Sequence, residues 1–171
     1  SAIGIGGLLE AGIGDTLRVS LTGDPVREVR AAYTMLNALG QRLRGVQYTS
    51  CPTCGRIGID LEKVVAEVER RLEDVAEPVR VSLIGCVVNG PGEALHSDIG
   101  LVGANGAGTI YVDGKPLKRV PEGELADELE KLVRERAARR FADAHVRREA
   151  ADRESVGQGE GGVLGGRRII K

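Results

Sequence analysis

The period at which apolar residues recur changes several times along this chain, and each period predicts a different element. The first dozen residues are small and apolar, which predicts a short helix weakened by its glycines. Residues 15–22 place apolar side chains at alternate positions, as in a strand with one buried face. Asp24 and Pro25 then provide an N-cap and a first-turn proline for a helix that extends to about residue 43. Helix, strand and helix in this order are typical of the last units of a β/α barrel.

Beyond Gly45 strands and helices keep alternating, but the loops between them contain glycine, proline and cysteine. Asp60 is the predicted N-cap of a helix between two apolar strands, and Asp113 with Gly114 is the predicted turn of a hairpin. The predicted elements are a strand at 46–50, a helix from about 61, a strand at 79–85, a glycine-rich loop at 89–94, a strand at 98–106, a hairpin at 109–120 and a helix from about 122. Together these elements predict an α/β (α+β) fold.

Charge and composition narrow the classes of function. The 171 residues include 24 lysines and arginines against 25 acidic residues, so no overall basic field is available for nucleic acid or an anionic membrane surface. No apolar run approaches the roughly 18 to 20 residues that cross a bilayer, and no signal peptide opens the sequence. We therefore expect a soluble, cytoplasmic protein with no nucleic-acid or membrane partner.

The two ends of the sequence have their own character. The chain begins at Ser1 and reads as part of a longer protein. The charged stretch 134–153 predicts a solvated helix rather than a surface for nucleic acid. The last residues, about 16 in number and rich in glycine, are predicted to be disordered.

Three cysteines carry the strongest chemical signal. Cys51 and Cys54 form a C-x-x-C pair directly after one predicted strand, and Cys86 follows another. If the two strands end at the same edge of one sheet, the three thiols can share a metal or a cluster. On spacing alone the pair also fits half of a zinc knuckle or a thioredoxin-type redox pair. The thioredoxin-type pair is disfavoured because glycines delay the next helix until about Asp60.

A fourth ligand must come from another residue type, because the chain has no fourth cysteine. His96 would complete a Cys3His zinc site, whereas Glu93 would give an iron a hard and exchangeable oxygen ligand. The residues alone leave both candidates open. Asn89, in the same loop, offers a donor and an acceptor to a ligand, but the loop is equally well explained as a tight turn.

Arg18 and Ser20 share the polar face of the predicted strand at 15–22. In a parallel barrel this face points to the interior, where an arginine beside a serine suits a phosphate group. A buried arginine paired with a carboxylate from another strand explains the same two residues equally well.

The segments SCPTCGR and IGCVVNGPGEA, preceded by EAGIGDTLRVSLTGDP, closely resemble the hydroxymethylbutenyl diphosphate synthase family of the methylerythritol phosphate pathway. The resemblance covers roughly residues 1–140. It implies that residues 1–45 are the last part of a TIM-type β/α barrel. It also implies that residues 46–140 form a [4Fe-4S] cluster domain similar to part of the sulfite and nitrite reductases. Residues 141–171 would be a charged helix extension and a disordered tail.

Position by position, the resemblance implies a ligand set for the cluster. The family's three thiolates fall on Cys51, Cys54 and Cys86, and its glutamate ligand falls on Glu93 rather than His96. An oxygen ligand that can exchange for a substrate oxygen lets electron delivery and activation of the leaving group occur at one iron.

The resemblance also implies a substrate, a donor and an assembly. Asn89 matches an asparagine that reaches the substrate, and Arg18 and Ser20 match residues near its phosphates. The family reduces 2-C-methyl-D-erythritol 2,4-cyclodiphosphate to 4-hydroxy-3-methylbut-2-enyl diphosphate with electrons from ferredoxin or flavodoxin. It acts as a homodimer in which the cluster domain of one chain covers the barrel of the other. Most of that barrel has no counterpart here, so we expect this chain alone to bind a cluster without turnover.

Two hypotheses from other classes remain open. One is a zinc-stabilised structural or interaction domain, and the other is a small iron–sulfur electron carrier. The carrier would need a fourth cysteine, which the sequence lacks. A broad absorption band near about 400 nm would exclude zinc.

Overall fold

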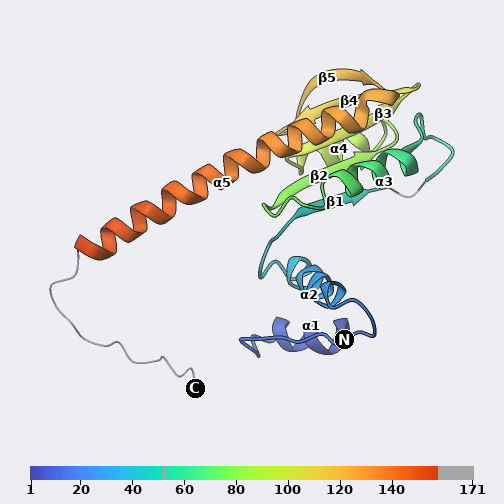
Figure 1. Cartoon of the computed structure of the whole chain (residues 1–171). Helices are drawn as coiled ribbons and strands as arrows, with labels where there is room; N and C mark the ends of the chain where they lie inside the picture. Colours follow the sequence, from blue (N-terminus) through green and yellow to red (C-terminus); the bar gives the residue numbers. More distant parts are fainter. Residues whose placement is uncertain (52, 158–171) are drawn as a thin grey trace.

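The computed structural model describes residues 1–51 and 53–157, with side chains as far as residue 145 (Figure 1). Two helices precede a five-stranded sheet, and a long helix follows it. In chain order the elements are α1 (Ala2–Glu10), α2 (Val26–Ala38), β1 (Val46–Ser50), α3 (Leu61–Arg71), β2 (Val79–Ile84), α4 (Gly90–Leu95), β3 (Ile99–Ala104), β4 (Ala107–Val112), β5 (Lys115–Pro121), the 3-10 helix η1 (Glu122–Glu124) and α5 (Leu125–Gly157). Within these ranges no helix combines the length and the apolar composition that a membrane span requires.

The sheet has the order β1-β2-β3-β4-β5 and is parallel in one half and antiparallel in the other. β1, β2 and β3 are parallel because a helix connects each to the next and returns the chain to the same end of the sheet. β3, β4 and β5 are antiparallel and joined by two-residue turns. The turns are Asn105–Gly106 and Asp113–Gly114, and all four residues have positive φ, as a type I′ turn requires. The predicted hairpin at Asp113–Gly114 is confirmed.

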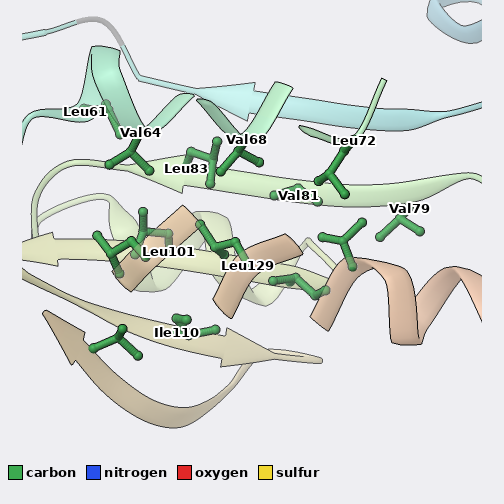
Figure 2. Packing of buried hydrophobic residues seen from close by; sticks show 14 of the residues in the cluster. Leu61, Val64, Val68, Leu72, Val79, Val81, Leu83, Leu101, Ile110 and Leu129 are labelled. Atoms are coloured by element: carbon green, nitrogen blue, oxygen red, sulfur yellow. The ribbon is translucent and has the colours of Figure 1, made fainter. Parts of the chain in front are cut away.

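The hydrophobic core lies on one face of the sheet, beneath α3 and α5 (Figure 2). β2 and β3 contribute alternate side chains, as the period of two predicts, and β4 and β5 contribute one side chain each, Ile110 and Val120. Burying each large side chain contributes about 1.5–3 kcal/mol of hydrophobic free energy. The fully buried large residues are Leu72, Leu83, Ile84, Ile99, Leu101, Ile110, Leu125, Leu129, Val68, Val79, Val81 and Val133. All but Ile84 belong to this core.

Charged side chains connect α3 to α5 along the edge of this core. Arg71 of α3 pairs with Glu67 at 2.6 Å and with Glu130 of α5 at 3.2 Å. Arg134 of α5 pairs with Glu130 at 2.9 Å and with Asp74, just after α3, at 3.0 Å. The two helices are therefore joined by a network rather than by one isolated pair.

A buried carboxylate fixes α5 to the amino ends of β2 and β3. Asp98, which is 5% exposed, accepts hydrogen bonds from Arg140 Nη2 at 2.7 Å and from the backbone N–H of Arg80 at 2.7 Å. Arg140 also donates to the carbonyl oxygen of Pro78. A buried charge is tolerated when it is paired and hydrogen-bonded in this way.

The strand predicted at 15–22 is wrong, because residues 1–45 contain no strand. The alternation persists in part, since Val19 is buried while Arg18 and Ser20 are exposed. A strand, however, needs a neighbour that accepts and donates its backbone hydrogen bonds. The one sheet formed by the described residues begins at Val46, so it offers no such neighbour to this segment.

The two helices of residues 1–45 are predicted correctly but bury little. α1 buries only Leu9, and α2 buries no residue. α2 begins after Asp24, whose carboxylate accepts a hydrogen bond from the N–H of Val26 at 2.9 Å, and it ends before the predicted end near residue 43. A cavity of about 710 Å³ separates α2 from β1 and α3, and the ion pair between Arg30 and Glu73 joins its two sides.

From β1 onward most predicted elements are confirmed, including the N-cap of α3, where Asp60 accepts from the N–H of Lys63 at 3.2 Å. The loop predicted at 89–94 is wrong, since residues 90–95 form α4. Asn89 occupies its N-cap position and Pro91 lies in its first turn, where a proline is tolerated. The final helix crosses residue 140 without a break and continues to Gly157, and the tail predicted to be disordered lies almost entirely outside the described residues.

Candidate metal centre

Cys51 and Cys86 follow neighbouring strands and lie at the same edge of the sheet. β1 ends at Ser50, directly before Cys51, and β2 ends at Ile84, two residues before Cys86. The two strands are parallel, with Ser50 opposite Leu83. Because the carboxyl ends of parallel strands meet at one edge, the expected meeting of the two cysteine loops is confirmed.

Backbone hydrogen bonds fasten the two loops to each other. The N–H of Gly58, in the loop that follows Cys54, donates to the carbonyl oxygen of Gly85 at 2.9 Å. The carbonyl oxygen of Gly58 in turn accepts from the N–H of Gly106 at 2.7 Å. A Cβ atom at Gly58 would lie 2.7 Å from the backbone nitrogen of Asn105, so this close approach requires glycine.

Cys86 differs from the other two cysteines in its surroundings. Its side chain is buried, whereas Cys51 is partly buried and Cys54 is exposed. The backbone N–H group of Asn89 donates to its sulfur, and so, with a smaller effect, does that of Val88. Both hydrogen bonds lower the pKa of the Cys86 thiol. Since the thiolate is the form that binds metals, the backbone before α4 favours the ligand form of this cysteine.

α4 carries the remaining candidates. Asn89 is its N-cap residue, Glu93 lies in its first turn and His96 follows its last residue. All three side chains are exposed. Among the described residues, the Glu93 carboxylate has no hydrogen-bond or ion-pair partner, which leaves it available to a ligand.

The predicted ligands are not gathered into a closed site. Among the side chains that the structure describes, no three of His, Cys, Asp or Glu lie close enough together to hold a metal ion. All three cysteines are free thiols. Thiolates and a carboxylate repel one another, so the binding energy of a metal is what draws such ligands together. The donor types themselves fit a cluster, because three sulfur donors stand on two loops at one sheet edge and Glu93, on the helix that follows Cys86, adds an oxygen donor.

Arg18 and Ser20 lie in another part of the fold. Both are exposed in the extended segment between α1 and α2. These helices lie beyond the amino end of β1, whereas Cys51 follows its carboxyl end (Figure 1). A single chain in this structure therefore does not bring Arg18 and Ser20 to the cysteines.

Sequence reasoning missed α4 and the way it packs. Asn89 followed by Pro91 is a helix-start signal that could have revealed it. No sequence pattern indicates that Ser82, on β2, hydrogen-bonds Ser97 just after α4, with 2.9 Å between their Oγ atoms.

Comparison with known proteins supplies the family. The family model described as "GcpE protein C-terminal domain" matches residues 47–135, and the "GcpE TIM-barrel domain" model matches residues 1–33. A protein from Symbiobacterium thermophilum is 51% identical over 146 residues, which cover 85% of this chain and 40% of that protein. A protein from Pseudomonas fluorescens is 51% identical over 147 residues, with the same shares of each chain. Both are named "4-hydroxy-3-methylbut-2-en-1-yl diphosphate synthase (flavodoxin)".

The match covers most of this chain but less than half of each relative. The chain spans about two fifths of the length of the curated relatives that it matches. The carboxy-terminal family model alone extends from β1 into the first third of α5, and it includes all three cysteines and α4. The chain therefore belongs to the GcpE family.

Proposed function

We propose that this chain provides the iron–sulfur part of a reductase that makes 4-hydroxy-3-methylbut-2-enyl diphosphate. The substrate is 2-C-methyl-D-erythritol 2,4-cyclodiphosphate, of the methylerythritol phosphate route to isoprenoids. The observation that carries the proposal is the placement of the two cysteine loops. They follow β1 and β2, which are parallel neighbours, in a chain of the GcpE family.

Cys51, Cys54, Cys86 and Glu93 would hold a [4Fe-4S] cluster. Three thiolates suit iron in such a cluster, and the lowered pKa of Cys86 supports one of them. Glu93 stands on the helix that follows Cys86 and has no competing partner among the described residues. Residues 46–140 then form the cluster domain, similar to part of the sulfite and nitrite reductases, with 141–171 as its extension and tail.

When bound, the cluster supplies electrons one at a time and a Lewis-acid iron for the departing hydroxyl group. The carboxylate of Glu93 would hold one iron through an exchangeable oxygen ligand, and the Asn89 side chain would orient the substrate beside it by hydrogen bonding. Arg18 and Ser20 bind the phosphates. In the overall reaction, the bond between a ring carbon and a phosphate oxygen breaks. The substrate takes up two electrons and one proton, and its hydroxyl group leaves as water.

The remaining assignments concern what completes the site. Residues 1–45 would be the last part of the barrel, and the match of residues 1–33 to the barrel model supports this assignment. In a homodimer, the cluster domain of one chain would cover the barrel of the other. This arrangement accounts for the separation of Arg18 from Cys51 within one chain. The names of the relatives favour flavodoxin over ferredoxin as electron donor. A cytoplasmic location stays a prediction.

The direct test is anaerobic reconstitution of the chain with iron and sulfide. We expect four irons and a broad absorption near about 400 nm, and loss of stable binding in Cys51→Ser, Cys54→Ser and Cys86→Ser. Glu93→Ala should retain the cluster but release one iron easily. Zinc in place of iron, lost on His96→Ala and kept on Glu93→Ala, would support the structural zinc domain instead.

A second test separates cluster binding from turnover. The reconstituted chain alone should not reduce the cyclodiphosphate, because the phosphates need several cations in fixed positions and the resemblance assigns only Arg18 to that role. Mixing it with a longer relative whose cluster ligands are mutated should restore activity if the site is shared between chains. Turnover by the chain alone would show that the barrel is not needed.

A further inference from the structure

α4 meets the sheet at two points where side chains are almost absent. Gly90 lies against β3 so closely that a Cβ atom there would be 2.5 Å from Cγ1 of Val102. One helical turn later, Ala94 lies against Gly100, where a Cβ would be 2.7 Å from the Cβ of Ala94. Real Cβ atoms do not approach this closely, so the backbone of α4 is held directly on β3.

A pair of buried hydroxyl groups fixes the other end of the helix. The Oγ atoms of Ser97 and Ser82 are 2.9 Å apart, and the Ser97 hydroxyl also contacts the carbonyl oxygen of Ala94 at 3.2 Å. Ser82 is 1% exposed and lies on β2, the strand that leads to Cys86. The end of α4 is thereby anchored to the strand that positions a proposed thiolate ligand.

Nothing else in the described part of the chain holds the Glu93 side chain in place. It is exposed and has no hydrogen-bond partner there. α4 has only six residues, and a helix of that length is not stable without tertiary packing. The position of the Glu93 carboxylate relative to the cysteine loops therefore depends on where the sheet holds α4.

We propose that Gly100, Ser97 and Ser82 are positioning residues that hold Glu93 at the cluster. This inference rests on the proposed function, because it assumes that Glu93 is an iron ligand. Gly100 allows α4 to lie close to the sheet, and the serine pair fixes its carboxyl end. Moving α4 outward by a few tenths of an ångström carries Glu93 with it, while Cys51 and Cys54 stay fastened through Gly58.

The test measures how fast a chelator removes iron from the reconstituted chain under anaerobic conditions. Glu93→Ala should lose its exchangeable iron about ten- to a hundredfold faster than the unaltered chain, and Gly100→Ala should approach that rate. Ser97→Ala should have a smaller effect in the same direction. Gly92→Ala is the matched control. It is also a glycine-to-alanine change, made in α4 itself, but no atom lies within 4 Å of the new Cβ.

Two measurements separate positioning from a general loss of structure. Thermal unfolding of the apoprotein by circular dichroism should stay cooperative, and where Gly100→Ala does not fold, Ser97→Ala carries the test. The double variant Glu93→Ala/Gly100→Ala should lose iron no faster than Glu93→Ala alone, because both changes act through one ligand.

The possible outcomes are distinguishable. Additive effects in the double variant, or equal effects of Gly92→Ala and Gly100→Ala, would overturn the inference. An unaltered rate in both Gly100→Ala and Ser97→Ala would overturn it as well, and each of these results leaves the cluster proposal intact. Failure of the unaltered chain to bind iron and sulfide would contradict the proposed function, and the inference with it.

Discussion

Residues 1–45 and residues 46–140 differ in how much of their apolar surface another element covers. In the first region only Leu9 and Val19 are buried, and α2 faces the sheet across a cavity. In the second, helices and strands bury a continuous core. Both regions contain a short segment with alternating apolar residues, at 15–22 and at 46–50, but only the second is a strand. The difference shows that an alternating pattern determines which side chains can be buried together on one face. A neighbouring strand is still needed to form the backbone hydrogen bonds of a sheet.

Amide hydrogen exchange should show the largest contrast between the two regions. Amides of β2 open only with global unfolding, so they should exchange at least about a thousandfold more slowly than those of residues 15–22. Mass spectrometry of peptides from a time course would measure this. Equal protection in the two segments would mean that residues 15–22 have acquired a ladder partner, for example in an assembly of chains.

A matched pair of core substitutions should show the next largest effect. Val81 of β2 is 1% exposed and Val19 is 6% exposed. Val81→Ala should lower the free energy of unfolding by about 2 kcal/mol, because it leaves a cavity in the continuous core. Val19→Ala should leave the main transition in urea unchanged. If the two variants shifted the midpoint equally, residues 1–45 would fold cooperatively with the sheet.

The two aspartate caps offer a smaller test of the same comparison. Asp60→Ala removes the acceptor for the N–H of Lys63 and should cost about 1 kcal/mol in the main transition. Asp24→Ala removes the acceptor for the N–H of Val26, and it should reduce helical circular dichroism without moving that transition. A shift of the transition by Asp24→Ala would contradict the independence of α2.

The smallest expected effect concerns acid stability. The pKa of Glu67 is lowered from its ordinary 4.5 to about 2 by hydrogen bonds to its carboxylate. The largest effect comes from Arg70, and Arg71 follows. Because the pKa is lower in the folded state, this stabilisation is present above about pH 4.5 and is lost as the pH falls toward 2. Glu67→Gln should reduce the dependence of the free energy of unfolding on pH in that range. Glu62→Gln, on the same helix and outside the network, should keep the slope of the unaltered chain.

Much of the fold was predictable because its local signals agree with its tertiary contacts. Asp60 marks a helix start that the core then buries, and Asp113 with Gly114 marks a turn that the sheet twist favours. The strand at 15–22 was not correctly predicted, because no local signal says whether a neighbour is present. The cysteine loops could be placed together, since strand direction follows from the connecting helix. How α4 lies on β3 could not, because it depends on contacts between Gly100 and Ala94 from separate elements.

The hydrogen bonds between Arg140 and Asp98 bear on where the folding unit ends. The carboxy-terminal family model stops at residue 135, before Arg140. A chain shortened to that point would lose Arg140, whose guanidinium at 2.7 Å is nearer to the buried Asp98 carboxylate than that of Arg80 at 3.9 Å. Removing one partner of a buried ion pair is destabilising, because the remaining charge is less well compensated. The family model and the packed structural unit therefore end at different residues. A chain shortened to the end of the family model would lose the part of α5 that holds Asp98.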